Sequence, residues 1–239
     1  MTTARGAAER WLLSCEHGGR EVPVEYAALF EGAEPVLNSH RGWDAGALDV
    51  FEILRTGADA AYPVHTTRLL IDLNRSLHHP QVFSEFTRAL GAEAHRDIIA
   101  RWWQPWRSAV AGKISAWLES GAHVRHLSVH SFTPELDGKC RNADIGLLYD
   151  PSRLTERQIC RAWRRRLELR GFRVRLNYPY RGTADGHTTA LRRRFGAAYS
   201  GIELELNQSL LPASRETLCD DLLQTAPWKQ GIMDRPQPQ

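Results

Sequence analysis

Hydrophobic positions along the chain follow two different spacings. Short runs rich in Val, Ile and Leu, bounded by polar or turn-forming residues, are typical of buried strands. Such runs occur at 11–14, 62–66, 69–72, 127–130, 145–149, 174–177 and 202–206. Longer stretches repeat their apolar residues at helical spacing, at 46–55, 93–119, 155–169 and 215–225. Thr155 followed by Gln158 predicts a capping box at the start of the third helix.

Alternating strand-like and helix-like segments predict an α/β fold in which helices cover both faces of a sheet. In such folds the functional residues lie in loops at the carboxyl ends of the strands. The sequence has no internal repeat and no low-complexity linker, so we expect a single domain over 1–239 with its core at about 11–230. Residues 233–239 contain two prolines and little that can pack, and we expect this tail to be frayed.

Composition narrows the class of protein. The 239 residues are 42% hydrophobic and 25% charged, and 31 basic against 28 acidic residues give a net charge of only +3. No stretch approaches the roughly 18 apolar residues of a membrane span. The N-terminus lacks the apolar segment of a secretory signal, so we expect a cytoplasmic protein with no membrane partner. The cysteines (Cys15, Cys140, Cys160 and Cys219) form no CxxC pair, which argues against a disulfide framework and a zinc ribbon.

Two histidines occur where strands are expected to end. His17 follows the first strand and precedes two glycines, and His130 closes the run at 127–130. A lone histidine has many roles, but two at strand ends favour a metal site, and neutral imidazoles suit zinc. A catalytic zinc site needs about three protein ligands and an open position. The third ligand is expected to be a carboxylate, Glu16, Glu21 or Asp44, although Asp44 could instead cap the following helix.

Two further groups of polar residues are candidates for substrate binding or catalysis. Asp72, Asn74 and Arg75 close the run at 69–72, and an arginine beside an amide suits binding of a carboxylate; the alternative is a structural Asp72–Arg75 pair. Glu203 and Glu205 lie on one face of an otherwise apolar strand. A buried glutamate is costly unless it is paired or functional, so it is either a general base on metal-activated water or the partner of an arginine.

Several motifs along the chain recur together in one known family. Their order is Glu16-His17-Gly18-Gly19 with Val22-Pro23, Trp43-Asp44 with Gly46-Ala47, Arg68 with Asp72-Leu73-Asn74-Arg75, His130-Ser131, Arg141 with Asp144-Ile145-Gly146, Pro179-Tyr180-Arg181-Gly182, and Glu205 in Leu204-Glu205-Leu206-Asn207-Gln208. With these motifs, from about residue 12 to 210, the chain resembles the N-formylglutamate amidohydrolase family. Its members are zinc-dependent amide hydrolases related in fold to the zinc carboxypeptidases and aspartoacylases.

The resemblance implies a three-layer sandwich with a mixed, mostly parallel sheet, and a Zn²⁺ cofactor. It also implies a substrate that bears a carboxylate, such as N-formylglutamate or a related N-acyl amino acid. The implied roles are listed together: His17, His130 and Asp44 as zinc ligands, Glu205 as catalytic base, Asn74 and Arg75 as the grip on the substrate carboxylate, Arg68 and Arg141 as second anchors or transition-state stabilisers, and Arg181 with Gly182 in the loop that lines the pocket. Family members tend to have two consecutive glycines where this chain has Gly182-Thr183, so the resemblance leaves the amide substrate open.

Two other classes of function are compatible with parts of the sequence. The arginines at 161, 164–166, 170 and 192–194 could bind nucleic acid or another polyanion. However, those at 161–170 share a helical pattern with Trp163 and Leu167, as on a solvated helix face, and no nucleic-acid-binding motif accompanies them. The other class is a non-catalytic small-molecule-binding protein on the same fold, which both histidines and Glu205 argue against. We therefore expect a small-molecule substrate and no nucleic-acid partner.

Overall fold

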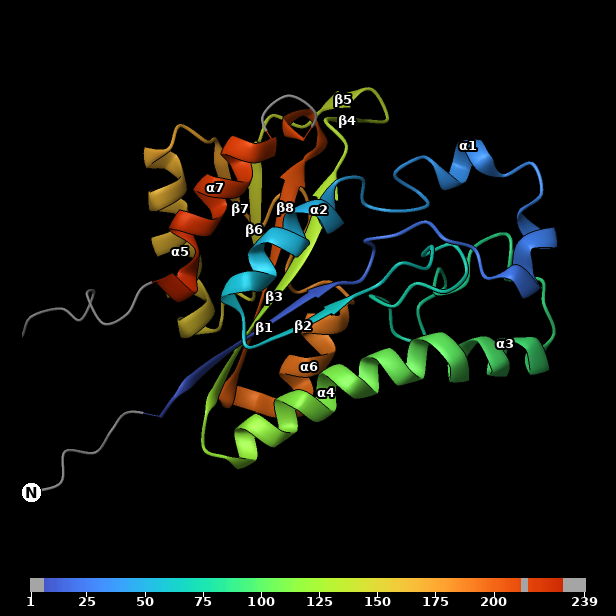
Figure 1. Ribbon diagram of the computed structural model, residues 1–239, viewed down its shortest axis with the longest axis horizontal. Helices are drawn as coiled ribbons and strands as arrows, with labels where there is room; N and C mark the ends of the chain where they lie inside the picture. The colour runs from blue at the N-terminus through green and yellow to red at the C-terminus, as the bar shows by residue number, and fades with distance from the viewer. Residues whose placement is uncertain (1–6, 212–214, 230–239) are drawn as a thin grey trace, which may run out of the picture.

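Six strands form the central sheet of the computed structural model, which describes residues 7–211 and 215–229 (Figure 1). They are β1 (Glu9–Cys15), β2 (Ala60–Pro63), β3 (His123–Phe132), β6 (Ile145–Leu148), β7 (Val174–Leu176) and β8 (Tyr199–Asn207), in the order β2-β1-β3-β8-β6-β7. Strands β2, β1, β3 and β8 are parallel, β6 pairs antiparallel with β8, and β7 is parallel to β6. The expectation of a mixed, mostly parallel sheet is confirmed.

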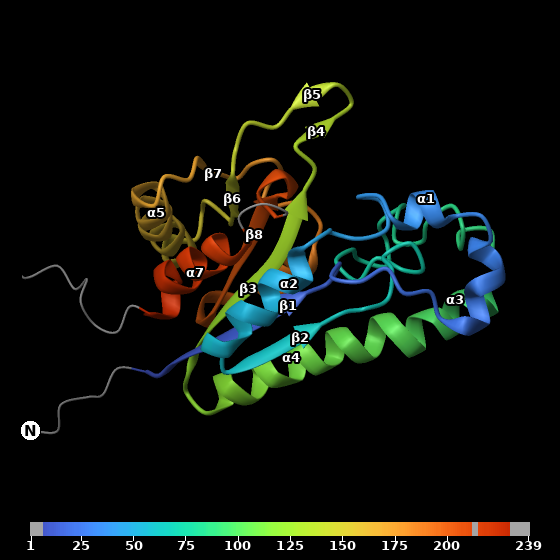
Figure 2. The same ribbon diagram turned by 45° about the horizontal axis from the view of Figure 1, so that its top comes forward.

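Helices cover both faces of this sheet, which completes the expected three layers (Figures 1 and 2). On one face α2 (Ala47–Leu54), α5 (Leu154–Leu169) and α7 (Arg215–Thr225) pack on the strands in one apolar cluster. On the other face lie α4 (Gln104–Glu119) and α6 (His187–Phe195). No helix in the described ranges is both long and apolar enough to cross a membrane.

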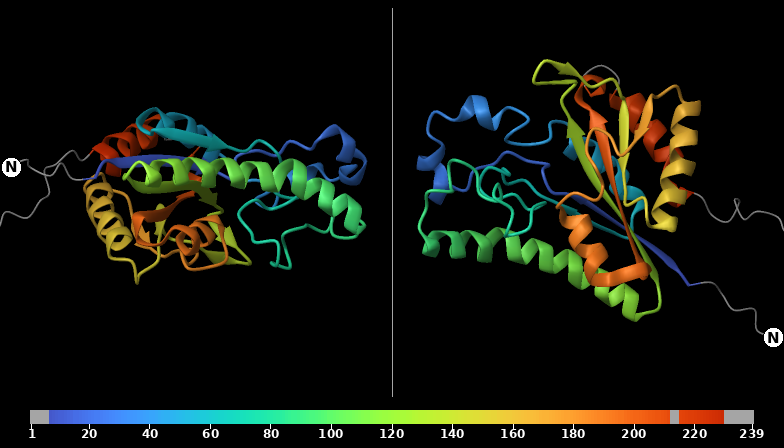
Figure 3. Two further views of the ribbon diagram at one scale, coloured as in Figure 1. Left: turned by 90° about the horizontal axis from the view of Figure 1, so that it is seen from below. Right: turned by 180° about the vertical axis from the view of Figure 1, so that it is seen from behind.

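A lobe extends beyond the carboxyl ends of β1 and β2, away from the rest of the sheet (Figure 3). It contains the 3₁₀ helix η1 (Val24–Phe30), α1 (Glu34–Leu37) and α3 (Ala92–Ile98). The π-helical turn η3 (Ile99–Trp103) joins α3 to α4, where the sequence predicts one continuous helix. The shorter elements are η2 (Arg55–Gly57), η4 (Gly196–Ala198), η5 (Gln208–Leu210), η6 (Pro227–Lys229) and the hairpin of β4 (Glu135–Leu136) and β5 (Lys139–Cys140) beyond the end of β3 (Figure 2).

The structure corrects three local expectations. The apolar run at 69–72 is a loop, because Thr67 starts a turn and accepts a hydrogen bond from the Leu69 amide, and the run packs within the lobe. Helix α5 begins at Leu154 after Arg153, with no side-chain cap, so the capping box at Thr155 is wrong. Helix α6 is not among the expected helices. Residues 233–239 lie outside the described residues.

The two faces of the sheet differ in polarity along the strands. On β1 and β3, Leu13 and Leu127 point to the α2/α5/α7 face, where the middle of the strands is apolar. The opposite face is apolar at its amino end, where Leu12 and Val124 pack under α4 and α6. Toward the carboxyl ends it becomes polar: Ser14 follows Leu12 on β1, His126, Ser128 and His130 follow Val124 on β3, and Glu203 and Glu205 lie on β8. This polar end leads into a cavity that is lined by both histidines, His17 and His130.

Candidate active site

A cavity of about 380 Å³ opens at the carboxyl ends of the parallel strands. Its walls come from the loop after β1, the end of β3, the middle of β8, and loops of the lobe. The site residues in its lining are His17, Asp44, Arg68, Asp72, Asn74, Arg75, His130, Arg181 and Glu205. Nearly all of the site residues expected from the sequence therefore meet in one place.

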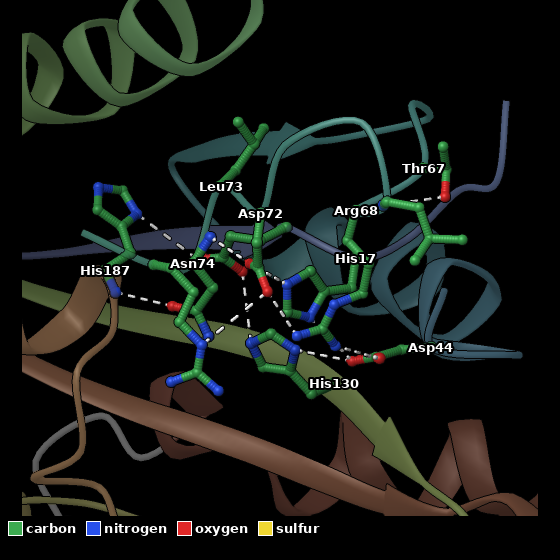
Figure 4. Close-up of polar contacts among 12 residues, drawn as sticks. His17, Asp44, Thr67, Arg68, Asp72, Leu73, Asn74, His130 and His187 are labelled. Carbon is green, nitrogen blue, oxygen red and sulfur yellow. Dashed lines mark hydrogen bonds and ion pairs between the residues drawn. The ribbon is translucent and has the colours of Figure 1, made fainter. Parts of the chain in front are cut away.

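His17, His130 and Asp44 converge on one point in this cavity (Figure 4). Asp44 Oδ2 lies 2.8 Å from His130 Nδ1 and 3.5 Å from His17 Nδ1, and all three residues are buried. The Asp44 amide donates to the His17 carbonyl at 2.9 Å, which brings the two loops together. Asp44 does not cap α2, whose N-cap is Gly46. His130 lies within β3, two residues before the end of the strand.

The loop that carries His17 depends on a close backbone approach. A Cβ atom at Gly19 would lie 1.9 Å from the carbonyl oxygen of His65, so only glycine fits. Two residues later, the Glu21 amide donates to the same carbonyl at 2.9 Å. This contact holds the His17 loop against the segment after β2, and it leaves the Glu21 side chain exposed rather than in the cavity.

A buried carboxylate lies behind the His17 imidazole. Asp72 Oδ1 is 2.8 Å from His17 Nε2, and Asp72 Oδ2 accepts a hydrogen bond of 2.6 Å from Arg68. Since a carboxylate only accepts, Nε2 carries the hydrogen and the Nδ1 lone pair points toward Asp44. Arg75 Nε lies 4.0 Å from Asp72, so the closest partner of Asp72 among the arginines is Arg68.

Electrostatics follow from burial and from these short contacts. Burial opposes the charged forms of His130 and Asp44. The negative charge of the Asp44 carboxylate outweighs this effect and raises the pKa of His130 to about 10. In return, the two imidazoles hold the pKa of Asp44 well below its ordinary value. Burial raises the pKa of Glu205 to about 8, and the neighbouring Asp44 charge adds to this increase. The pKa of Glu205 thus lies near neutral pH, whereas the pKa values of Asp44 and Asp72 are well below their ordinary values.

The two glutamates of β8 have different surroundings. Glu203 accepts a hydrogen bond of 2.5 Å from the Thr188 hydroxyl. Glu205 Oε2 is buried without a hydrogen-bond partner, and Glu205 forms no ion pair within the described ranges. A buried arginine partner is found instead for Glu156, which binds Arg192 at 3.0 Å. The alternative of an ion pair at Glu205 is therefore not what the structure contains.

The groups expected to bind substrate divide into two sets. Arg75, Asn74 and Arg181 line the cavity, and the Arg75 guanidinium donates to the Asp185 carbonyl at 2.8 Å. Asn74 Oδ1 accepts from the His187 amide at 2.7 Å (Figure 4), so its NH₂ group remains for a ligand.

Arg141 and Gly182 stand behind the cavity wall. Arg141 donates to the Tyr180 hydroxyl at 3.2 Å, and it is Tyr180 that lines the cavity. A Cβ atom at Gly182 would lie 2.2 Å from the Tyr149 amide nitrogen, so this glycine permits close backbone packing.

The donor set fits a zinc ion. Two imidazoles and a carboxylate, with ligand atoms within 4.8 Å of one another, match the three protein ligands of a catalytic zinc site. Bonds of about 2.0–2.2 Å in a tetrahedral arrangement place ligand atoms about 3.4 Å apart. His17 Nδ1 is buried and forms no hydrogen bond, which is costly unless another group binds it.

The sequence did not reveal the polar residues that contact His17, Asp44 and His130. Asp72 was considered only as a structural partner of Arg75, and Ser128 was not singled out. A signal existed, because His126, Ser128 and His130 alternate along one strand and so share a face. The contacts of Glu16 and Asp72 could not be inferred, since they depend on the pairing of β1 with β3 and on how the loop at Asp72 crosses the end of the sheet.

The sheet with helices on both faces, and a buried histidine–carboxylate cavity at the carboxyl ends of its strands, define an α/β protein with an enzyme-like site. The model of the N-formylglutamate amidohydrolase family matches residues 9–211, and the chain therefore belongs to this family of enzymes that hydrolyse amide bonds. No curated protein matches the chain in sequence.

Two solved structures share the fold. A gene product of Agrobacterium tumefaciens superimposes with a TM-score of 0.77 at 25% identity, over 93% of this chain and 90% of that one. The N-formylglutamate amidohydrolase of Ralstonia eutropha superimposes with a TM-score of 0.70 at 18% identity, over 92% of each chain.

Proposed function

We propose that this protein is a zinc-dependent hydrolase that cleaves the amide bond of an N-acyl amino acid, such as N-formylglutamate or a related small amide bearing a carboxylate. The observation that carries the proposal is the convergence of His17, Asp44 and His130 in one cavity with the unpaired Glu205. Membership of an amide-hydrolysing family supports the reaction class.

His17, Asp44 and His130 are the residues that would hold the zinc ion. The bound ion would supply polarisation of the amide carbonyl and a lowered pKa of water, to about 7. Arg68 supports this set from the side: it bonds to Asp72 at 2.6 Å and lies 3.5 Å from Asp44 Oδ1. Its positive charge also offers stabilisation to an oxyanion that develops in the cavity.

Glu205 acts as the general base and then as the general acid. Its carboxylate takes the proton of the attacking water and delivers it to the nitrogen of the leaving amine. A pKa near the operating pH suits a group that must do both, and burial raises the pKa of Glu205 to about 8. Its Oε2 atom, buried without a partner, is free to exchange that proton.

Arg75 and Asn74 orient the substrate through its carboxylate. A guanidinium and an amide NH₂ group on adjacent residues supply several N–H donors at one wall of the cavity. Arg181 adds a second cation at the rim, and Arg141 acts through Tyr180 rather than on the substrate directly. Binding at this wall aligns the amide with Glu205.

A polyanion partner has less support. Several of the arginines considered for that role are engaged within the protein: Arg164 with Glu168, Arg170 with Asp221, and Arg192 with Glu156. Pairing of this kind reduces the charge offered to a phosphate backbone.

The test is turnover of N-formyl, N-acetyl and N-succinyl amino acids by zinc-loaded protein, with Glu205→Gln and Glu203→Gln as a matched pair. Both glutamates lie on the same face of β8 and line the cavity, but Glu203 is bonded to Thr188. We expect Glu205→Gln to lower kcat by about 10²–10⁴-fold and Glu203→Gln to stay within about tenfold of wild type.

Metal analysis completes this test. We expect near-stoichiometric zinc in the purified protein, loss of activity in chelator, and recovery on adding zinc. Full activity in chelator would overturn the metal assignment, and full activity of Glu205→Gln would overturn the assignment of the base. No turnover of any compound in the panel would count against the substrate class.

A further inference from the structure

A chain of buried, hydrogen-bonded polar groups lies behind His130, under α4 and α6. Ser128 Oγ is 2.8 Å from His130 Nε2 and donates to Glu16 Oε2 at 2.5 Å. The other oxygen of Glu16 accepts from Ser14 Oγ at 2.9 Å. Ser14, Glu16 and Ser128 are each no more than 1% exposed. Glu16, one of the expected alternatives for the third zinc ligand, therefore lies on the far side of His130 from Asp44.

The positions of the hydrogens in this hydrogen-bonded chain follow from counting the donors, because each serine hydroxyl has only one hydrogen. The Glu16 carboxylate only accepts, so each serine hydroxyl uses its single hydrogen in the bond to Glu16. Ser128 Oγ can then only accept from His130, and His130 Nε2 must carry a hydrogen. In a neutral imidazole this leaves the lone pair on Nδ1, the atom that faces Asp44 at 2.8 Å.

We propose that Ser128 and Glu16 are positioning residues that fix His130 in the tautomer with its hydrogen on Nε2, so that Nδ1 is presented to the zinc ion. The inference rests on the proposed function, since it concerns the same zinc site. The arrangement at His130 differs from that at His17, whose imidazole is contacted directly by the Asp72 carboxylate at 2.8 Å. At His130 the Glu16 carboxylate lies farther from the imidazole, with Oε2 3.5 Å from Nε2, and the Ser128 hydroxyl bridges the two.

The other arm of Glu16 provides an internal control. Ser14 Oγ is 2.7 Å from His126 Nε2, and His126 Nδ1 is 2.7 Å from the Tyr199 hydroxyl. His126 and Tyr199 are fully buried and neither lines the cavity. Ser14 and Ser128 thus share a residue type, burial and the same carboxylate, but only Ser128 leads to a residue proposed to bind zinc.

The experiment compares the zinc affinity of wild type, Ser128→Ala and Ser14→Ala by competition with a chelator. Loss of a group that orients a metal ligand costs about 10–100-fold in affinity, and we expect a loss of that size for Ser128→Ala. For Ser14→Ala we expect a change below about threefold. Thermal unfolding of the metal-free proteins shows whether both variants are folded and equally destabilised.

A measurement on the unmutated protein keeps the inference testable if Ser128→Ala does not fold. Long-range ¹⁵N–¹H NMR of zinc-loaded wild type should show a hydrogen on His130 Nε2 and metal-bound Nδ1. A metal-bound Nε2, unchanged zinc affinity of Ser128→Ala, or an equal loss in Ser14→Ala would each overturn the positioning role while leaving the zinc site intact. Failure of wild type to bind zinc would overturn the proposed function and this inference with it.

Discussion

The two faces of the central sheet carry out different tasks with the same strands. The face under α2, α5 and α7 is apolar along most of the strands, with buried Arg125 and Ser200 at its amino end and Ser131 near its carboxyl end, and its apolar residues form one continuous cluster. The face under α4 and α6 is apolar only at its amino end and then carries serine, histidine and glutamate into the cavity. Because side chains alternate along a strand, residues 128 and 130 support and line the site while 127 and 129 build the core.

This difference separates stability from function along one strand. Apolar burial stabilises the fold in proportion to area, whereas buried polar groups are costly unless each is hydrogen-bonded. On the polar face most groups are satisfied by one another, and the exceptions include His17 Nδ1 and Glu205 Oε2. Both of these unsatisfied atoms belong to residues of the proposed site. A ligand in the cavity can offset the cost of burying these two atoms, whereas His187 Nδ1 and Trp106 Nε1, which also lack a hydrogen-bond partner among the described residues, lie outside the cavity.

The sharpest way to separate the two faces is to remove a side chain from the apolar one. Leu167 on α5 is fully buried in the apolar cluster, and Leu167→Ala should lower the free energy of unfolding by about 2–5 kcal/mol. Zinc affinity of the folded protein should not change, because α5 does not contribute to the cavity. Urea unfolding and a chelator competition measure the two quantities.

A neighbour on the same helix gives the matched control for this substitution. Leu169 is 86% exposed, and Leu169→Ala should change stability by less than about 0.5 kcal/mol. Equal losses in the two variants, or a loss of zinc affinity in Leu167→Ala, would show that the two faces are not independent.

The polar face is tested by a substitution at Arg75, which lines the cavity. Arg75→Lys keeps the positive charge but loses the planar guanidinium that can bind a carboxylate through two hydrogen bonds. One lost bond to a charged group is worth about 1.5–3 kcal/mol, so we expect KM to rise by roughly 10–100-fold with little change in kcat. Steady-state kinetics on the best substrate of the panel gives both constants.

Arg88 serves as the comparison for Arg75. It is an exposed arginine that also lines the cavity, on the loop that contributes Glu85. Arg88→Lys should leave KM within about threefold of wild type if the effect at residue 75 comes from the directed guanidinium. Matching increases in both variants would instead indicate a general loss of attraction in the cavity.

The sequence predicted the apolar face better than the polar one. The Val, Ile and Leu runs of β1, β3, β6, β7 and β8 were found because burial imposes the same residue types wherever a strand crosses a core. The run at 69–72 has that composition too, but its burial comes from the lobe, and local composition cannot distinguish the two. Strand β2 was expected at 62–66 and lies at Ala60–Pro63.

Within the site, the residue types were predictable and their contacts were not. His17, His130 and Asp44 stand out by type and position, and the structure brings them together. That Asp72 contacts His17, and that Glu16 reaches His130 through Ser128, depends on residues 55 and 112 positions apart in the chain. The first contact is set by how the loop at Asp72 folds over the end of the sheet, and the second by the pairing of β1 with β3, in which Ser14 is in register with Ser128. No local pattern records either one.

The smallest expected effect lies at the edge of the sheet, where neither face is involved. Asp144 precedes β6 and accepts hydrogen bonds from the Arg173 side chain at 2.9 and 3.2 Å and from the Arg173 amide at 2.8 Å. Burial opposes its ionisation, but these bonds outweigh burial and lower the pKa of Asp144 below its ordinary value. A carboxyl group whose pKa is lowered on folding stabilises the protein above its unfolded pKa of about 3.9 and loses that contribution as the pH falls through the folded value.

Asp144→Asn keeps an acceptor for the Arg173 amide and removes the charge. Because Arg173 is largely exposed, this substitution should lower stability at pH 7 by less than about 1 kcal/mol. Urea unfolding of both proteins from pH 7 to pH 3 should show this difference shrinking toward acid pH, and a difference that grows toward acid pH would contradict the assignment.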